Sequence, residues 1–224
     1  MSLTLHAKWV STGATCAARV PFRVIVVQNH GVIADIAITP PACPVKYLEA
    51  VQGTRTSSRT EGPLSSVDAR ERVLAVIEGT LTPGVDRYSV AGYNLMPLLV
   101  WLGLEKGNQF PAYFASWDAR DELTAPNPLY SAFGGDGKRR FSLQHLVREL
   151  TPKMTYLPLD FESRALAIAY LNTMHRLSIP SNIAKLLTKR KPESTPESRC
   201  GYVCEGVCVA WLGSAACDCM PRAR

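Results

Sequence analysis

The strongest structural signal in the chain is the stretch Pro21-Phe22-Arg23-Val24-Ile25-Val26-Val27-Gln28-Asn29-His30-Gly31-Val32-Ile33-Ala34-Asp35-Ile36-Ala37-Ile38-Thr39. Two runs rich in β-branched residues flank Asn29, His30 and Gly31. Val and Ile favour strands, and Asn and Gly tolerate the positive φ that a tight connection needs. The stretch therefore predicts an antiparallel hairpin, which the prolines that follow bring to an end.

The residues before this hairpin alternate between apolar and polar. Leu3, Leu5, Ala7 and Trp9 are separated by Thr4, His6 and Lys8. A period of two indicates a strand with one buried face and one wet face. Together with the hairpin, this strand predicts a small, mostly antiparallel sheet within roughly the first 40 residues.

The middle of the chain predicts several helices joined by long loops. A short helix is expected at 45–52, and the polar stretch 53–63 has no periodicity and is expected to be a loop. Ser65 and Asp68 fit a capping box for a helix that ends near Gly79. Further helices are expected after Asn94, at 116–123 and at 142–150.

The last third of the chain predicts three helices with short connections. The first spans 162–177 and the second, capped by Ser181, ends at Pro192. Thr195 and Pro196 indicate the start of a third. Three such helices are expected to pack as a bundle. The expected fold class is thus α+β, with a sheet region at 1–60, a mixed helical and loop region at 61–155 packed on the sheet, and a helical bundle at 156–224.

The composition is that of an ordinary globular protein. The chain has 224 residues, of which 46% are hydrophobic and 20% are charged. Such a chain buries enough apolar surface to fold, which excludes disorder over its whole length. Its longest apolar run is too short to cross a bilayer, and its first residues do not resemble a signal peptide. The expectation is a soluble, cytoplasmic protein.

Positive charge is concentrated in one segment. Residues 138–191 contain eleven Lys or Arg and three Asp or Glu, a net charge of +8 against +6 for the whole chain. The rest of the chain is therefore slightly acidic. Concentrated positive charge suits a polyanionic partner such as nucleic acid, and a solvated basic face without a partner is the alternative.

Five cysteines gather near the end of the chain: Cys200, Cys204, Cys208, Cys217 and Cys219. The first three have helical spacing, which favours an apolar stripe on the third helix of the bundle. The spacing matches no standard zinc motif, although four thiolates are available. No metal or other cofactor is therefore expected, and whether these cysteines bind zinc stays open.

Two familiar nucleic-acid and nucleotide motifs fit the sequence poorly. The third C-terminal helix would occupy the place of a recognition helix in a helix-turn-helix, but it carries Glu197 and Glu205 and offers only Arg199 as a cation. The glycine loop before Lys138 lacks the spacing of a P-loop and continues into Arg139 instead of Ser or Thr. Contacts of Lys185, Lys189, Arg190 and Lys191 to phosphates, which need only charge, are more plausible than base reading. For the glycine loop, a loop tip with basic residues is favoured over a phosphate-contacting loop.

Two residue pairs offer weak catalytic alternatives. Asp160 and Glu162 follow an apolar run as in the first motif of metal-dependent 3′–5′ exonucleases, but they suit the first turn of the following helix better. Arg140 and His145 match a two-residue pattern found in some helical ribonucleases. Any catalytic role for either pair stays open, and no catalytic residue is assigned.

The leading hypothesis is that the chain is a non-catalytic nucleic-acid-binding subunit of a larger nucleoprotein assembly. It is expected to bind RNA or DNA and to contact other protein subunits, and no membrane partner is expected. The residues expected to contact phosphates are Lys138, Arg139, Arg140, Arg148, Lys185, Lys189, Arg190 and Lys191. A protein–protein scaffold or a viral or phage structural subunit is the first alternative, because aromatic residues at 110–130 suit an interface. A nuclease is the second.

Overall fold

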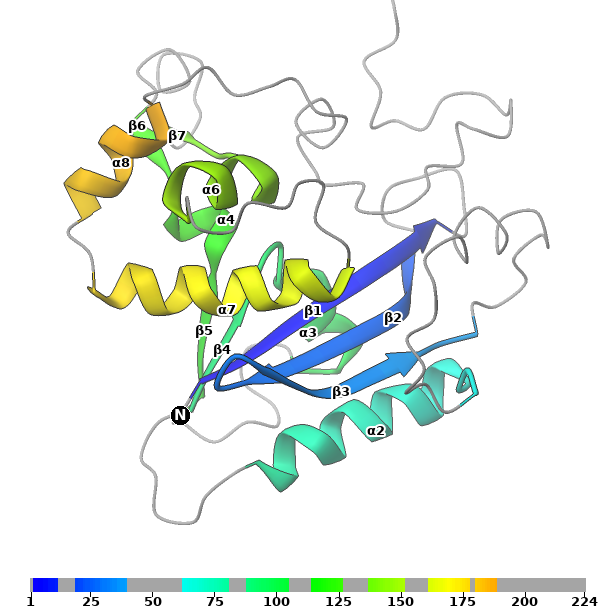
Figure 1. Ribbon diagram of the computed structural model, residues 1–224. Helices are drawn as coiled ribbons and strands as arrows, with labels where there is room; N and C mark the ends of the chain where they lie inside the picture. Colours follow the sequence, from blue (N-terminus) through cyan, green and yellow to red (C-terminus); the bar gives the residue numbers. More distant parts are fainter. Residues whose placement is uncertain are drawn as a thin grey trace, which may run out of the picture.

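The computed structural model contains a five-stranded mixed sheet with helices on both faces (Figure 1). It describes residues 2–11, 19–39, 62–80, 88–104, 114–126, 137–151, 161–177 and 180–188. An α+β fold, expected from the sequence, is confirmed.

The strands of the sheet are arranged in the order β3-β2-β1-β4-β5. Their bounds are β1 Ser2–Ser11, β2 Arg19–Gln28, β3 Gly31–Ala37, β4 Tyr88–Gly92 and β5 Phe114–Asp118. β1, β2 and β3 pair in antiparallel fashion, whereas β4 and β5 continue the sheet parallel to β1. The antiparallel sheet expected at the start of the chain therefore forms three of the five strands of a larger mixed sheet.

Helices cover the two faces of this sheet. The helices are α2 Ser66–Gly79, α3 Met96–Trp101, α4 Ala119–Glu122, α6 Leu143–Leu150, α7 Phe161–Leu177 and α8 Pro180–Thr188. In Figure 1, α7 crosses one face, over β1, β2 and β4. α2 and α3 pack on the opposite face.

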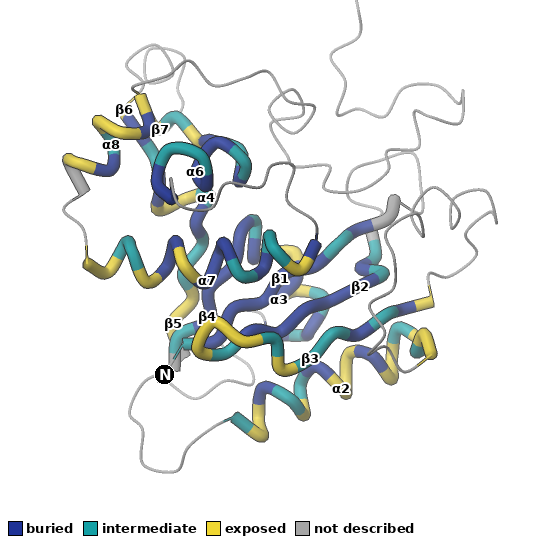
Figure 2. Tube along the Cα trace, in the orientation of Figure 1, coloured by how far each residue is buried: buried dark blue, intermediate teal, exposed yellow. Residues whose placement is uncertain are grey.

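The side chains of β1 alternate between the two faces of the sheet, as the sequence predicts. Leu3, Leu5, Ala7 and Trp9 point into a core shared with α2 and α3. The opposite face of the sheet presents the side chains of β2 that pack against Phe161, Ala165 and Ala169 of α7. Figure 2 shows the resulting pattern, with β1 and β2 buried in the middle and the outer side of α2 exposed.

A smaller layer of structure packs beside the sheet, and we call it the helical lobe. It comprises residues 119–126, 137–151 and 180–188, which form α4, α6 and α8 and the short strands β6 Ala125–Pro126 and β7 Lys138–Arg139. Its apolar core includes Leu123, Leu146 and Leu187 and continues into Ile168 and Leu171 of α7. The lobe is therefore fixed to the sheet through α7.

Several local predictions are confirmed. Gln28 and Gly31 pair across the expected hairpin, and Asn29 and His30 both have positive φ, 49° and 64°. Such values at both central residues suit a tight turn between twisted strands. Ser65 caps α2, with its hydroxyl accepting from the backbone N–H of Asp68 at 3.2 Å.

Two predictions in the middle of the chain are wrong in detail. The residues 116–118 belong to β5, and only 119–122 of the expected helix form α4. Asn94 does not cap α3, because it has a φ of 53° and Leu95 occupies the cap position. Both corrections involve long-range contacts that local patterns do not contain: β5 pairs with β4, and Asp118 binds the turn that precedes α3.

The C-terminal bundle is described only in part. α7 and α8 correspond to its first two expected helices. The third, expected from Thr195, and the cysteine cluster lie outside the described residues, as does the short helix expected at 45–52. None of the helices in the described ranges is both long enough and apolar enough to cross a membrane.

Candidate functional site

The described cations of the predicted phosphate-contacting set lie in the helical lobe. Lys138 and Arg139 form β7, Arg140 follows it, Arg148 is on α6 and Lys185 is on α8. α8 packs on both α6 and β6, and β6 pairs with β7. The fold therefore brings five of the eight residues into one lobe, whereas 189–191 lie outside the described residues.

Three of these cations lie at the lobe surface and have different surroundings. The Nε of Arg140 donates to Asp121 at 2.7 Å, with exposed side-chain fractions of 35% and 55%. The guanidinium of Arg139 lies over the ring of Phe141, 5.4 Å from its centroid. Lys185 is exposed on α8. An exposed ion pair contributes little to stability, so phosphate oxygens can replace Asp121 at small cost.

Arg148 has a different environment from the other cations. Its Nε donates to Glu149 at 2.9 Å, and one terminal nitrogen lies 3.0 Å from Nδ1 of His145. The Glu149 side chain is only 7% exposed. The Arg148 guanidinium therefore links groups within the lobe, and its predicted phosphate contact competes with these bonds.

His145 is buried between α6 and α8. Its Nε2 lies 2.9 Å from the carbonyl oxygen of Leu187, and its ring stacks on Phe141 with centroids 4.9 Å apart. A carbonyl only accepts, so Nε2 carries the proton and Nδ1 accepts from Arg148. The contacts of His145 are therefore those of a residue that joins two helices.

The acidic catalytic alternative is only partly described. Glu162 is exposed in the first turn of α7, where a carboxylate interacts favourably with the helix dipole. Asp160 lies outside the described residues. Among the residues that are described, no three His, Cys, Asp or Glu side chains gather into a group that could hold a metal ion.

A second group of cations lies on the sheet, under the first turn of α7. Lys8 of β1 and Arg23 of β2 are direct cross-strand partners. Arg23 donates two hydrogen bonds to Asp35, at 2.8 and 2.6 Å, and its guanidinium lies 5.1 Å from the ring centroid of Phe161. Arg164 lies one turn further along α7 from Phe161. We call Lys8, Arg23 and Arg164 the sheet-face cluster.

His6 lies beside this cluster and is almost completely buried. Its ring centroid is 4.8 Å from that of Phe161. Burial, followed by the charges of Arg164 and Lys8, lowers the pKa of His6 to about 3. Burial, then Arg164 and Arg23, also lowers the pKa of Lys8. The cations are thus close enough to repel one another.

Sequence reasoning missed the sheet-face cluster. The available signal was the polar half of the β1 alternation, in which His6 and Lys8 share one face. That face was expected to be wet, whereas α7 covers most of it. The contribution of Arg23 and Arg164 depends on the strand register and on the placement of α7, which are set by tertiary contacts.

Asp118 is a buried carboxylate whose hydrogen bonds give it a structural role. Its oxygens accept from the backbone N–H groups of Asn94, Leu95 and Arg120 at 2.9, 2.6 and 2.9 Å. Burial raises the pKa of Asp118, and these three hydrogen bonds oppose that rise. The carboxylate therefore fastens the turn after β4 to the end of β5.

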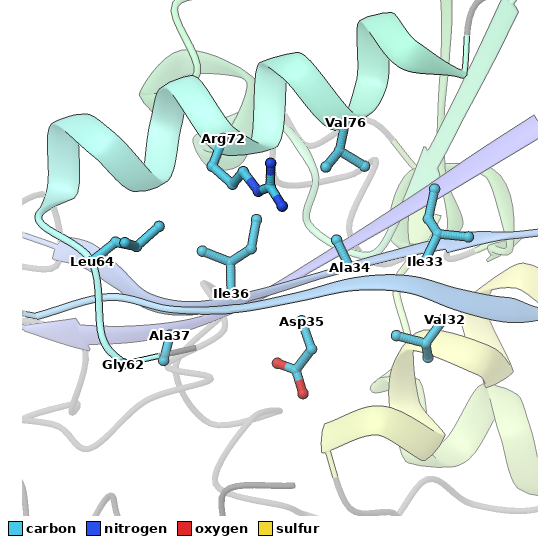
Figure 3. A pocket seen from close by; sticks show the side chains of 10 residues that line it. All are labelled: Val32, Ile33, Ala34, Asp35, Ile36, Ala37, Gly62, Leu64, Arg72 and Val76. Atoms are coloured by element: carbon cyan, nitrogen blue, oxygen red, sulfur yellow. The ribbon is translucent and has the colours of Figure 1, made fainter. Parts of the chain in front are cut away.

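A groove of about 230 Å³ runs between the edge strand β3 and α2. Figure 3 shows Ile36 and Ala34 of β3 facing Arg72 and Val76 of α2, with Asp35 on the opposite side of the strand. The orientation of Asp35 agrees with its bonds to Arg23 on the α7 face. Most of the residues that line the groove are apolar and Arg72 is its one cation, so it lacks convergent polar side chains for a small ligand.

The sheet and its covering helices define the class of the protein: an α+β chain with a mixed five-stranded sheet between helices and an added helical lobe. Its structure is similar to that of the Neurospora crassa Pan2 catalytic unit, which comprises a protease and a nuclease domain, with a TM-score of 0.57 and 14% sequence identity. The match covers 85% of this chain and 30% of that chain. At this identity the likeness concerns the fold alone. No family model and no curated protein sequence matches the chain.

Proposed function

We propose that the chain is a non-catalytic nucleic-acid-binding subunit of a larger nucleoprotein assembly. The helical lobe contacts phosphates through Lys138, Arg139, Arg140 and Lys185, with Lys189, Arg190 and Lys191 continuing the same basic segment. Such contacts position the protein on a strand without reading its sequence.

The observation that carries this proposal is the gathering of the described cations in one lobe. They come from β7 and the residue after it and from α8, which are far apart in the chain and are brought together because α8 packs on β6, the partner of β7. Charges on one lobe act together on a polyanion, because each contact releases condensed counterions. The likeness in fold to a structure that contains a nuclease domain agrees with a nucleic-acid partner.

The test measures binding of a fluorescent single-stranded RNA and a DNA of the same sequence by anisotropy. The variant Lys138→Ala/Lys185→Ala removes one cation from β7 and one from α8. We expect it to bind roughly tenfold more weakly at low salt. The slope of log K against log salt is expected to fall by about 1.4, because each phosphate contact on a single strand contributes about 0.7.

The matched control is Arg70→Ala/Arg72→Ala, which removes two exposed cations from α2 on the other side of the sheet. Both variants lose the same charge, so the control separates a local surface from a general charge effect. Equal losses in the two variants, or unchanged binding in the lobe variant, would contradict the proposal.

A nuclease is the second candidate, because the similar Pan2 structure contains a nuclease domain. Incubating end-labelled RNA and DNA with the protein, with and without Mg²⁺ or Mn²⁺, tests for cleavage. Metal-dependent cleavage that is lost in Glu162→Gln would support this candidate over a non-catalytic role. Cleavage lost only in His145→Ala would favour the pair Arg140 and His145, provided that the variant keeps its fold.

A further inference from the structure

The strand β3 lies at the edge of the five-stranded sheet. Just after β3, the N–H of Ile38 donates to the carbonyl oxygen of Phe22 on β2 at 2.8 Å. Because the backbone groups of an antiparallel strand alternate between its two sides, those of Ala37 point away from β2. The carbonyl oxygen of Ala37 agrees with this, since it accepts from the N–H of Leu64 at 3.0 Å. The N–H of Ala37 points to the same side, where the described chain gives it no backbone acceptor.

Both ends of this outer edge are limited by local structure. At the C-terminal end, Leu64 forms a short parallel bridge with Ile38, so one residue already adds to the sheet there. At the other end, the ladder between β2 and β3 shifts register and leaves Ile33 without a partner in β2. Such a bulge interrupts regular pairing along an edge. The stretch that remains for a further strand is therefore short, from Ala34 to Ala37.

The groove between β3 and α2 follows the same stretch of the edge. It is lined by residues 32–37 and by Arg72 and Val76 of α2. In Figure 3 the side chains of Ala34 and Ile36 point from the strand toward the helix, and those of Arg72 and Val76 point from the helix toward the strand. Its volume of about 230 Å³ is below the roughly 300–1,000 Å³ of small-molecule sites. A small groove along a strand suits alternate side chains of an extended peptide.

Arg72 gives this groove a charge preference. Its side chain is exposed, and no described carboxylate forms an ion pair with it. A guanidinium can bind a carboxylate through two N–H groups, and the apolar side chains of Ala34, Ile36 and Val76 line the same groove. A matching occupant therefore combines apolar side chains with an acidic one. Two copies of the chain that pair edge to edge through β3 would instead bring a second Arg72 to the same side.

We propose that this edge binds an extended segment of a partner protein, which adds a strand to β3. The main chain of the segment bonds the outward N–H of Ala37, its apolar side chains enter the groove at alternate positions, and an acidic side chain pairs with Arg72. The groove lies at α2, which packs on the opposite face of the sheet from α7. The inference goes beyond the proposed nucleic-acid role of the helical lobe and does not depend on it.

The first experiment selects ligands for the full chain from a phage-displayed library of short random peptides. The selected sequences are expected to carry apolar residues at alternate positions and one Asp or Glu. One such peptide is synthesised with a fluorescent label, and its affinity for the protein is measured by anisotropy. A library that yields no binding peptide, or peptides without an acidic residue, overturns the proposal.

The second experiment reverses the charge of the groove. Arg72→Glu is expected to weaken binding of the acidic peptide about tenfold, because attraction becomes repulsion. A peptide with Lys in place of its acid is expected to bind Arg72→Glu better than the unmodified chain. The matched control is Arg70→Glu, which makes the same change on the same helix at a residue that lies against Gly103 and does not line the groove. Equal losses in the two variants would show a response to net charge alone and overturn the proposal.

The third experiment tests the groove and the strand edge directly. Ala34→Leu fills the groove with a larger apolar side chain, so it is expected to weaken peptide binding at least about tenfold without lowering the Tm. Bound peptide is also expected to slow hydrogen exchange of the Ala37 amide about tenfold. Peptide binding that survives in Ala34→Leu, or that leaves the Ala37 amide unchanged, contradicts strand addition. Sedimentation of the chain alone detects the other occupant: a dimer that Ala34→Leu dissociates assigns the groove to a second copy and overturns the proposal.

Discussion

His6 is an ionisable side chain that the fold keeps without charge. It is 2% exposed, packs against Phe161 and has a pKa of about 3, because burial and the charges of Arg164 and Lys8 disfavour its protonated form. In an unfolded chain a histidine titrates near 6.5. Between these two values the unfolded state binds more protons than the folded state, so stability is complete above the unfolded pKa and falls as the pH decreases.

The first prediction concerns this loss of stability in acid. Lowering the pH from 7 to 4.5 is expected to cost about 2–3 kcal/mol through His6 alone. The variant His6→Phe keeps an aromatic ring and does not titrate, so its stability is expected to fall by that much less over the same range. Urea unfolding of both proteins at the two pH values measures the difference. Parallel losses in the two proteins would show that His6 does not carry the effect.

The β2–β3 hairpin shows what a local sequence pattern can determine. Its turn is formed by Asn29 and His30, which both have positive φ. Asn adopts this conformation readily, but His carries a Cβ that crowds the backbone there. The side chain of His30 is exposed, and its described contacts are long: its Nε2 lies 3.4 Å from the hydroxyl of Thr173, and its ring centroid lies 6.4 Å from that of Tyr170. The turn therefore holds a residue whose side chain does little to offset its backbone strain.

The second prediction is that His30→Gly stabilises the protein by about 1 kcal/mol, because glycine adopts a positive φ without this strain. Chemical unfolding at pH 7 measures the change. The paired variant His30→Val is expected to destabilise the protein, since a β-branched residue suits this conformation least. A loss of stability in His30→Gly would mean that the contacts of His30 with Thr173 and Tyr170 outweigh the strain.

The elements found by local patterns differ from those that were missed. The hairpin, α2, α6 and α7 carry their own signals, such as the Ser65 cap and the spacing of apolar residues in α7. β4 and β5 are five residues long and pair in parallel with strands far away in the chain. Parallel strands contain no turn signal between them. Their place in the sheet follows from packing, and a pattern of neighbouring residues does not encode it.

The two groups of cations in the whole molecule differ in the same way: one could be predicted from the sequence and the other could not. The lobe cations were predictable because their segment is basic in sequence, and packing of α8 on β6 keeps them together. The sheet-face cluster joins residues 8, 23 and 164, whose surroundings in the sequence have no common feature. These three residues lie close together only because of the β1–β2 register and the position of α7. Charge summed along a chain therefore finds surfaces built from one segment and misses those built from several.

The sheet and the helical lobe are connected by a buried hydrogen bond as well as by α7. Tyr93, in the turn after β4, has a ring in the core of the lobe, and its hydroxyl donates to the carbonyl oxygen of Phe141 at 2.9 Å. Phe141 precedes α6 and also lies under the guanidinium of Arg139. This bond therefore affects how firmly the cationic part of the lobe is held to the sheet.

The third prediction is that Tyr93→Phe destabilises the protein by about 1–2 kcal/mol, because the buried carbonyl of Phe141 loses its donor. Amide hydrogen exchange is expected to accelerate in α6 and α8 more than in α2, which contacts the other face of the sheet. Tyr170→Phe removes an exposed hydroxyl from α7 and serves as the control. If exchange rises equally in α2 and α6, the lobe and the sheet open as a single cooperative unit, and the Tyr93 hydroxyl has no separate role in joining them.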